Sequence, residues 1–390
     1  MFVYRKEDLP KDPVFPAELD KLGYFMNDND QIRRISDPEQ EFQFKINRNP
    51  RWNELQREAM NECIRKLVLP RLRNLGLVTL HLPLNSGPTK PHVPILVSKN
   101  LSTASRIILV FGEPIQDLGI WAYWTVGAEN INAGSAVDFA KAVLERGENE
   151  HNGGKKGDIA LVLANTGQLI WHCATGRALS INSWLAQPRP SAVESAPGET
   201  KRNKIPGNEN WQAHVSSVFG GILSARGQLA RKDAKIDVIG VAEGGLGAVR
   251  YLALNWNTWR SHISAICLAN PLHTKTTELA PSCGQPGEAD SFAAFIASRC
   301  RAYLLSNEPL GLPLFDTPDH GCNCYSSGEG LNVECIMPKA WPHMLKWLDH
   351  AYADPDYCEE QLEVVQIGTE GDATGTEAST EVGTEAGTKG

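Results

Sequence analysis

Apolar residues recur with a helical period in the first part of the chain and gather into short continuous runs in the rest. From Asn53, a suitable N-cap, to about Leu69 they recur every three or four positions, which predicts an amphipathic helix. Pro70 should end or kink that helix because it lacks a backbone N–H. Earlier in the chain, an Asn/Asp cluster between Phe25 and the alternating segment 41–46 predicts a small β-hairpin.

From residue 77 onward, strand-like runs alternate with helical patterns. The first two strands, expected at 77–84 and 92–98, are joined by a Gly/Pro turn and should be antiparallel. Strands and helices then alternate along the rest of the chain. The strands are expected at 106–112, 158–164, 236–242, 263–269, 302–306 and 333–337, and several of them are unbroken apolar runs, which are typical of burial on both faces. The helices are expected at 135–146, 211–223, 246–256, 289–298 and 341–351. This order predicts an α/β protein, a three-layer α/β-hydrolase-like sandwich with a mostly parallel eight-stranded sheet.

The predicted organisation has three parts. Residues 1–75 should form a hairpin-and-helix extension packed on the core, and residues 76–355 the α/β-hydrolase-like domain. Within that domain the stretch 187–210, rich in Pro, Ser, Gly and charge, should be a long surface loop or lid. The segment 363–390 repeats Gly-Thr-Glu and has too few large apolar side chains to offset chain entropy, so it should be a disordered tail.

Charge and cysteine content narrow the function classes. The net charge is −8, but the last 28 residues hold six acidic residues and one lysine, so the rest carries only about −3. The chain therefore lacks the overall positive charge that attracts nucleic acid, and direct nucleic-acid binding is not expected. Two local basic clusters exist. The first, interpreted as part of a helix surface, contains Arg65, Lys66, Arg71 and Arg73, and the second, interpreted as part of a loop, contains Lys201, Arg202 and Lys204. No secretory signal or membrane span is visible, and the nine cysteines are interpreted as reduced thiols of a protein in the nucleus or cytoplasm.

The segment 236–247 is the most informative about chemistry. A buried strand runs directly into a helix across small residues, which matches the G-x-nucleophile-x-G turn of α/β-hydrolases. Gly240 and Gly244 occupy the two small positions, so the nucleophile position falls on Ala242, whose methyl group cannot attack a carbonyl. A register shifted by one would place Glu243 there, with Val241 at a position that favours a small residue.

The other parts of such a site can be located by the same strand order. The acid should follow the sixth or seventh strand, where Glu308 lies, and the base should be a histidine after the last strand, where His343 lies inside the start of the final helix. The oxyanion donors should come from the loop after Gly112, but Pro114 has no N–H and Glu113 would repel a developing oxyanion. We interpret this arrangement as a degenerate hydrolase site in which Glu308, His343 and His320 are candidate remnants.

A histidine and two thiols stand close together at His320, Cys322 and Cys324. Zinc usually takes four ligands with C-x₂₋₄-C spacing, whereas this C-x-C pair is tighter and no second pair follows at a usual distance. A buried loop with inert thiols is expected, with a metal site or a Cys–His nucleophile as alternatives. No phosphate loop is present, and the glycines after Gly244 do not complete a dinucleotide fingerprint, so we expect neither a metal nor a cofactor.

Over roughly residues 18–355 the chain resembles the Arb2 domain family, and most closely its filamentous-fungal members. The resembling segments are Gly23-Tyr24-Phe25 with Asn27 and Ile32-Arg33, Val110–Glu113, Leu163–Gly167 and Gly240–Gly245. The resemblance implies an α/β-hydrolase-like fold and, through the family's namesake and relatives, a link to Argonaute and siRNA chaperoning, to fungal class II histone deacetylases and to co-transcriptional regulation. It would place the protein in RNA silencing and heterochromatin formation, with a protein partner of the Argonaute-complex or histone-deacetylase type.

Three functions follow as hypotheses. The preferred one is a non-catalytic interaction module, a pseudoenzyme, because the elbow at Ala242 carries no nucleophile. The alternative is an active, esterase-like α/β-hydrolase that uses Glu243 or a Ser or Cys from the segment 322–327. The third is a small-molecule binder or sensor that uses the pocket left at the carboxyl ends of the strands.

Overall fold

The computed structural model describes residues 9–146, 158–279, 290–315 and 317–362. Within these ranges one mixed sheet contains nine strands: β3 (Leu77–Leu82), β4 (Val93–Ser98), β5 (Arg106–Phe111), β6 (Ile159–Leu163), β9 (Lys235–Val241), β10 (Ile263–Ala269), β11 (Cys300–Leu304), β12 (Pro313–Leu314) and β13 (Asn323–Ser326). Their order across the sheet is β12-β13-β11-β10-β9-β5-β6-β4-β3. Strands β6, β5, β9, β10, β11 and β13 are parallel neighbours, whereas β4 and β12 are antiparallel to theirs. This is the predicted α/β-hydrolase-like fold. Seven of the eight expected strands are present, and β12 and β13 bring the number in the described sheet to nine.

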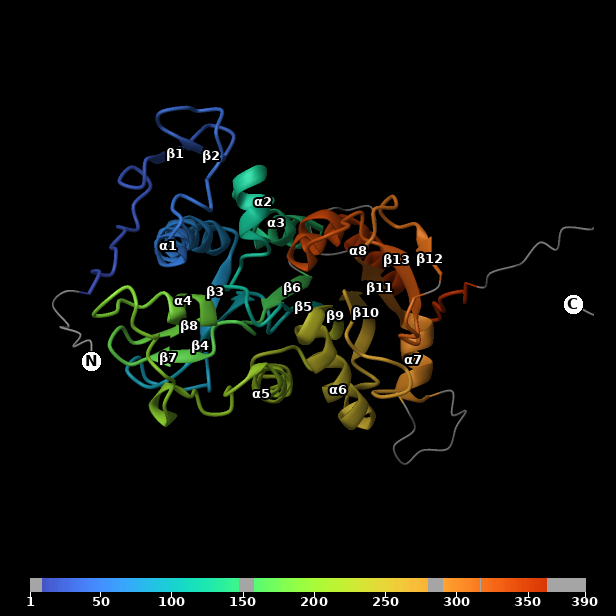
Figure 1. The fold of residues 1–390 in the computed structure, drawn as a ribbon. Helices are drawn as coiled ribbons and strands as arrows, with labels where there is room; N and C mark the ends of the chain where they lie inside the picture. Colours follow the sequence, from blue (N-terminus) through green and yellow to red (C-terminus); the bar gives the residue numbers. More distant parts are fainter. Residues whose placement is uncertain (1–8, 147–157, 280–289, 316, 363–390) are drawn as a thin grey trace, which may run out of the picture.

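Helices cover both faces of the sheet (Figure 1). One layer contains α1 (Pro50–Asn74), α3 (Ala136–Arg146) and α8 (Ile336–Ala353), and the other contains α5 (Trp211–Ser217), α6 (Ala242–Trp259) and α7 (Phe292–Arg299). Strand β5 shows how the sheet separates two cores: Ile108 and Val110 pack with the first layer, and Ile107, Leu109 and Phe111 with the second. The alternation follows from the two-residue period of a strand, and every residue of β5 is buried.

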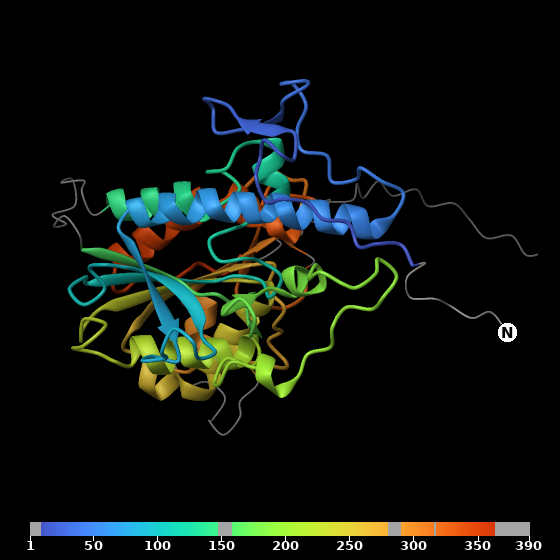
Figure 2. The same cartoon turned by 90° about the vertical axis from the view of Figure 1, so that its left-hand side faces the viewer.

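The N-terminal region differs from the sequence prediction at both of its elements. Helix α1 is capped by Asn49 rather than Asn53, and it continues through Pro70 to Asn74. Burial of Val68 and Leu72 on either side offsets the backbone hydrogen bond that Pro70 cannot make. Figure 2 shows α1 lying along one face of the sheet, with a small hairpin above it.

That hairpin pairs β1 (Tyr24–Met26) with β2 (Ile32–Arg34), so the predicted turn after Phe25 is correct. The predicted second strand at 41–46 is wrong, because this segment contains no strand. It is fixed by ring contacts instead: Phe42 packs edge-on against Tyr24 and against Phe44, with ring centroids 5.3 Å and 4.9 Å apart. The alternating aromatic residues of the segment 41–46 therefore pack through their side chains and do not pair as a strand.

The last strand of the parallel sheet differs from the sequence prediction. The strand predicted at Val333–Met337 is wrong, because Val333–Cys335 forms a 3-10 turn and Ile336 begins α8. The last parallel strand is β13, in the segment expected to be a cysteine-containing loop. All four of its residues are buried, and its polar side chains find partners: Asn323 donates to the Glu360 carbonyl and Ser326 to the Glu308 carbonyl.

The stretch 187–210 is a loop with one 3-10 turn, Lys201–Asn203, and its first residues, 187–192, contact the N-terminal segment. Ser191 donates to the Pro10 carbonyl, and the guanidinium of Arg51 joins Asp12 to the carbonyl oxygens of Leu185 and Gln187. No helix in the described ranges is long and apolar enough to cross a bilayer. The predicted tail, 363–390, lies outside the described residues.

Candidate functional site: a nucleophile elbow without a nucleophile

The turn from β9 into α6 has the geometry of a nucleophile elbow. Ala242 has a φ of 45°, in the left-handed region that non-glycine residues rarely adopt, and its side chain is buried. Strand β9 leads into this turn from the centre of the sheet, and α6 begins at Ala242 itself. The carboxyl ends of β9 and its neighbours meet on the face seen in Figure 1. The residue at the tip of the turn is an alanine, so the position supplies no hydroxyl, thiol or carboxylate.

The two glycines that flank Ala242 allow this turn to pack closely. A Cβ on Gly240 would lie 2.3 Å from the Cα of Gly245, and a Cβ on Gly244 would lie 2.3 Å from the carbonyl oxygen of Gly112. Both contacts are with backbone, which cannot move aside as a flexible side chain could. The G-x-A-x-G pattern thus corresponds to a sharp turn wedged between the next turn of α6 and the end of β5.

The loop after β5, where an oxyanion hole would form, is closed by Gln116. Its side-chain oxygen accepts the Glu113 N–H at 3.0 Å, and its amide nitrogen donates to the Trp121 carbonyl at 2.8 Å. The neighbouring loop supports this arrangement, because Thr166 donates to the Gly112 carbonyl at 2.6 Å. The Glu113 N–H is therefore already engaged, and Pro114 has none to offer.

The charges of two further carboxylates act on Glu113, which lies beside the elbow. Glu113 comes from the loop after β5, Glu243 from the first turn of α6, and Glu334 from the turn before α8. Burial, together with the charges of Glu243 and Glu334, raises the pKa of Glu113 to about 7. Burial also raises the pKa of Glu334. Among the residues that the structure describes, no lysine or arginine forms an ion pair with any of these three glutamates, which we call the elbow carboxylates.

The contacts of the candidate remnants Glu308 and His343 are structural ones. Glu308 is exposed, and its own backbone N–H is bound by Ser306. His343 lies two turns into α8, where its Nδ1 is 2.9 Å from the Tyr303 hydroxyl and its ring lies against Gly311. The loop that follows the last parallel strand, β13, spans residues 327–335 and contains no histidine.

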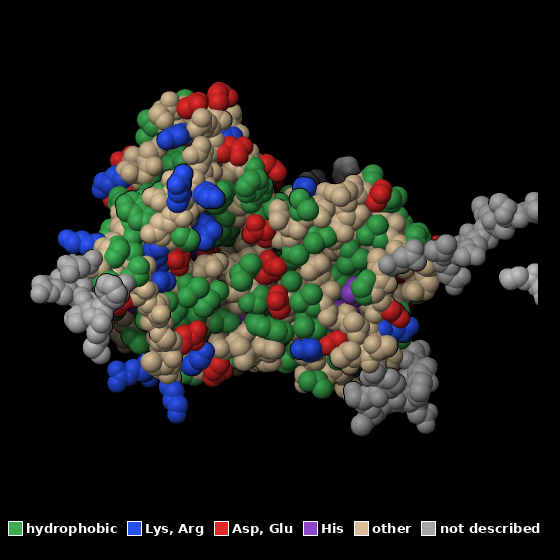
Figure 3. All heavy atoms as spheres, in the orientation of Figure 1, with side chains coloured by type: hydrophobic (Ala, Val, Ile, Leu, Met, Phe, Trp, Pro, Cys, Tyr) green, Lys and Arg blue, Asp and Glu red, His purple; other side chains and the backbone are tan. Residues whose placement is uncertain are grey.

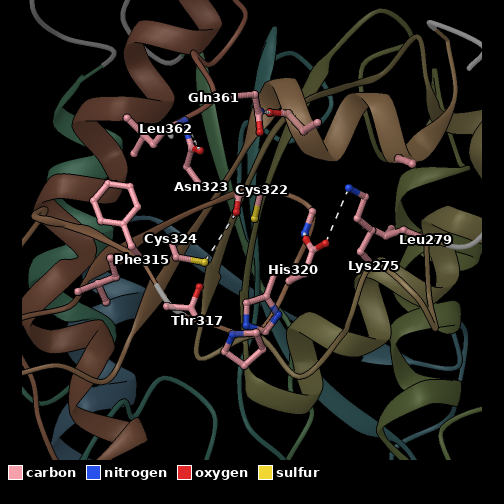
Figure 4. A pocket seen from close by; sticks show the side chains of 16 residues that line it. Lys275, Leu279, Phe315, Thr317, His320, Cys322, Asn323, Cys324, Gln361 and Leu362 are labelled. Atoms are coloured by element: carbon pink, nitrogen blue, oxygen red, sulfur yellow. Dashed lines mark hydrogen bonds and ion pairs between the residues drawn. The ribbon is translucent and has the colours of Figure 1, made fainter. Parts of the chain in front are cut away.

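His320 belongs to a different place in the fold. It exchanges hydrogen bonds with His273, ring nitrogen to backbone oxygen in both directions, at 2.7 and 2.8 Å. Figure 4 shows it beside Cys322 and Cys324 on the wall of a cavity of about 360 Å³. A hydrogen bond with Cys300 and burial raise the pKa of Cys322, and burial raises that of Cys324 to about 11, so both thiols are held protonated and poorly nucleophilic.

No group of three or more His, Cys, Asp or Glu side chains in the described ranges is placed to hold a metal ion. The basic cluster on α1 is largely neutralised. Arg65 pairs with Glu58, Glu62 and Asp117, and Arg71 with Asp30. Lys66 and Arg73 remain on the wall of a cavity of about 530 Å³ between α1 and the β3–β4 pair.

Sequence reasoning located Ala242, Gly240 and Gly244 but missed Gln116 and Glu334. A weak signal for Gln116 exists in its position three residues after Glu113, a spacing at which a side-chain amide can reach back to a backbone N–H. Glu334 could not have been found, because it sits in a segment interpreted as a strand.

Comparison with known proteins supports the predicted resemblance. The model of the Arb2 domain matches residues 15–310. The cotranscriptional regulator ARB2A homolog of Xenopus tropicalis is 29% identical over 149 residues, 37% of this chain and 34% of the relative. The human cotranscriptional regulator ARB2A is 27% identical over 147 residues, 37% of this chain and 35% of the relative. The chain thus matches about a third of the length of these relatives.

Two solved structures are similar to this chain at low sequence identity. A histone deacetylase from Saccharomyces cerevisiae has a TM-score of 0.43 and 14% identity, covering 75% of this chain and 98% of its own. The peroxisomal alpha-beta-hydrolase Lpx1 from the same yeast has a TM-score of 0.37 and 12% identity, covering 75% and 93%. The family match extends from the N-terminal segment through the elbow to the loop after β11, and the chain therefore belongs to the Arb2 domain family.

Proposed function

We propose that this protein is a non-catalytic interaction module that acts in transcriptional or chromatin regulation. The observation that carries the proposal is the elbow at Ala242: the strained turn is present, and the nucleophile is not. The surrounding residues support it, because the side chain of Gln116 already accepts a hydrogen bond from the Glu113 N–H, and the loop 327–335 after β13 contains no histidine. The relatives named as cotranscriptional regulators support the regulatory setting and a nuclear location.

The partner that we propose is a protein subunit of an Argonaute or histone-deacetylase type of assembly, as the family resemblance implies. Affinity purification of the tagged full chain from native cells, followed by mass spectrometry, tests this. We expect a stable protein partner at near-stoichiometric yield. Recovery of the chain alone, under conditions that preserve other nuclear complexes, would contradict the proposal.

A hydrolase with unusual machinery is the alternative, and it makes the opposite prediction. Cys322 and Cys324 are unsuited to it because their pKa values are raised, and Ser327 is buried and donates to the Glu329 carbonyl. Turnover of short-chain p-nitrophenyl esters by the purified chain, abolished by Glu243→Gln, would overturn the non-catalytic proposal. We expect rates at the level of the buffer.

A further inference from the structure

The cavity of about 530 Å³ beside α1 is large enough to hold a small organic molecule. Its walls come from α1, from the strands β3 and β4, from the loops that follow β5 and β6, and from the strand β8 (Arg177–Leu179) with the short helix α4 (Ile181–Leu185). Its described walls include none of the elbow residues 240–244. The cavity is therefore a second place, distinct from the elbow, where a ligand could be bound.

Ion pairs and hydrogen bonds join these walls to one another. Glu62 of α1 binds Arg65 of the same helix at 2.8 Å and Arg177 of β8 at 3.1 Å. Arg65 also binds Asp117, in the loop after β5, at 2.6 Å. Asp117 in turn accepts a hydrogen bond at 3.0 Å from Gln168, in the loop after β6. Walls tied together in this way favour a site that is formed before its ligand arrives.

Two basic side chains on the α1 wall have neutral hydrogen-bond partners. Lys66 donates to the Ala17 carbonyl at 3.2 Å, and Arg73 donates to the Thr79 hydroxyl of β3 at 3.3 Å. Neither forms an ion pair with a carboxylate in the described ranges. They stand seven residues apart, about two helical turns, and so lie on the same face of α1. This wall therefore favours an anion.

Figure 3 shows the wider distribution of charge on one face of the molecule. Lys and Arg side chains gather on the side where α1 and the hairpin above it lie, whereas Asp and Glu side chains occupy the centre of that face. An anion that approaches the cavity is therefore attracted by the surface around it as well as by its wall.

The β3–β4 wall and the loops beside it supply aromatic and apolar side chains. The rings of His81 and His92 stack with their centroids 4.0 Å apart. His92 is fixed further because its Nδ1 donates to the Lys90 carbonyl at 2.8 Å, whereas His81 is exposed at the end of the stack. The nearly buried Leu118 and Leu179 add apolar surface to the cavity. A ligand here needs an apolar or flat body in addition to its charge.

Two unpaired cations favour a phosphate monoester over a carboxylate. A phosphate monoester carries a charge of about −1.5 to −2 near neutral pH, and its three terminal oxygens accept hydrogen bonds from an ammonium and a guanidinium together. A carboxylate carries a single charge, which one guanidinium neutralises through two parallel hydrogen bonds. The charge of the phosphate is thus the better match to this wall.

We propose that this cavity binds a phosphate monoester of a small organic molecule, with its phosphate held by Lys66 and Arg73. The organic group lies against His81 and against the apolar side chains of Leu118 and Leu179. This site adds a ligand to the protein and does not depend on the proposed role as an interaction module.

The first test separates the two parts of the ligand. The full chain, in a phosphate-free buffer, is titrated calorimetrically with 1-naphthyl phosphate, with 1-naphthol and with inorganic phosphate. We expect saturable binding of the ester with one site per chain, and affinities about tenfold or more weaker for the other two compounds. Equal affinity for the ester and inorganic phosphate would mean an adventitious ion only. Equal affinity for the ester and naphthol, or no binding of the ester, would also overturn the proposal.

The second test locates the bound ester. Lys66→Gln and Arg73→Gln change exposed side chains and should each weaken binding of 1-naphthyl phosphate about tenfold. The matched control is Arg57→Gln, an exposed arginine of the same helix outside the cavity wall, which should bind as wild type does. The ring resonance of His81, identified from His81→Gln, should shift on binding, and that of the exposed His350 on α8 should not. Unchanged affinity in the first two variants, or equal loss in all three, would overturn the assignment.

The third test distinguishes two sources of the phosphate. Adenosine 5′-monophosphate has a flat base that can stack on His81, and hexyl phosphate has an aliphatic chain. Tighter binding of the first would assign the cavity to a nucleotide, and tighter binding of the second to a lipid-like phosphate, in both cases with loss in the Lys66→Gln and Arg73→Gln variants. If neither binds more tightly than inorganic phosphate, the proposed ester site is wrong.

Discussion

A left-handed alanine costs about 1–2 kcal/mol, because its Cβ crowds the carbonyl oxygen that follows. Ala242 adopts this conformation although its methyl group performs no chemistry. The surrounding glycines explain why the conformation persists: the turn is fixed by backbone contacts at Gly240 and Gly244, and Ala242 has to follow.

Restoring a hydroxyl at this position should not restore hydrolysis. We predict that Ala242→Ser hydrolyses p-nitrophenyl acetate and butyrate at the wild-type rate, within about twofold, because a serine needs both a base and oxyanion donors. The loop 327–335 after β13 contains no histidine, and the Glu113 N–H donates to the Gln116 side chain. A burst of p-nitrophenol in the variant would show that a base exists which the structure does not reveal.

Glu113 should make the stability of the protein fall as the pH rises. Its pKa is about 7 when folded and about 4.5 when unfolded, so between these values the native state holds a proton that the unfolded chain has lost. The ionisation costs about 3 kcal/mol in total by pH 8. We predict that Glu113→Gln flattens this slope and raises the free energy of unfolding at pH 8 by about 1–3 kcal/mol, measured by urea denaturation from pH 5 to 8.

The difference between the wild-type and variant curves isolates Glu113, since other buried groups titrate in both proteins. Glu39→Gln, which changes an exposed carboxylate, serves as the control and should leave the slope as it is. Parallel curves for wild type and Glu113→Gln would mean that Glu113 titrates as an ordinary surface glutamate.

At the scale of elements, the junction of β9 with α6 depends on close backbone approach. We predict that Gly240→Ala lowers the free energy of unfolding by about 3 kcal/mol or prevents folding, because its Cβ would lie 2.3 Å from Gly245 Cα. The control is Gly220→Ala, in the helical segment Val218–Leu223, where no atom lies within 4 Å of the added Cβ. That change should be neutral or stabilising by up to about 1 kcal/mol in urea denaturation. Equal stability of the two variants would contradict the packing described here.

Elements with a strong local pattern could be predicted from the sequence, and those that depend on distant partners could not. The runs in β5, β9 and β10 are long, apolar and buried throughout, so their identity is independent of neighbours. Strand β13 is four residues long and half polar, and its partner β11 and the Glu308 and Glu360 carbonyls hold it. The short, mostly apolar segment Val333–Met337 suits a strand or a helix equally, and the structure places a 3-10 turn and the start of α8 there.

The same distinction applies to the candidate site. The elbow was predictable because its small residues are contiguous in the sequence. The closure of the oxyanion loop was not predictable, because it depends on a loop conformation that brings the Gln116 side chain back to the Glu113 N–H. The effect of Glu334 on the pKa of Glu113 was not predictable either, because the two residues are more than 200 positions apart in the sequence.

At the scale of the whole molecule, one carboxylate fastens the C-terminal segment to the sheet. Glu359 is 5% exposed and accepts hydrogen bonds from Arg301 at 2.7 Å, Tyr325 at 2.6 Å, Trp347 at 3.1 Å and Tyr357. These donors come from β11, β13, α8 and the segment itself. The segment after α8 is thus tied to three elements at the far edge of the sheet.

We predict that Glu359→Ala lowers the free energy of unfolding by about 3–5 kcal/mol, because it leaves the half-buried Arg301 without its carboxylate partner. The adjacent, exposed Glu360→Ala should change it by less than about 0.5 kcal/mol. Urea denaturation gives the two values, and limited proteolysis should show faster cleavage after residue 353 in the first variant alone. Protection equal to wild type in Glu359→Ala would show that other contacts hold the segment.

The backbone packing at the elbow has a consequence for how such a protein can change over evolutionary time. Replacing a serine by alanine at position 242 needs one substitution and leaves the core intact. Removing the turn would require simultaneous changes at Gly240, Gly244 and the end of β5, since each of these backbones is packed against another. Single mutations along that route would be eliminated as unfolded intermediates. Catalysis can therefore disappear from a lineage in one step, whereas the shape that once served it is inherited almost unaltered.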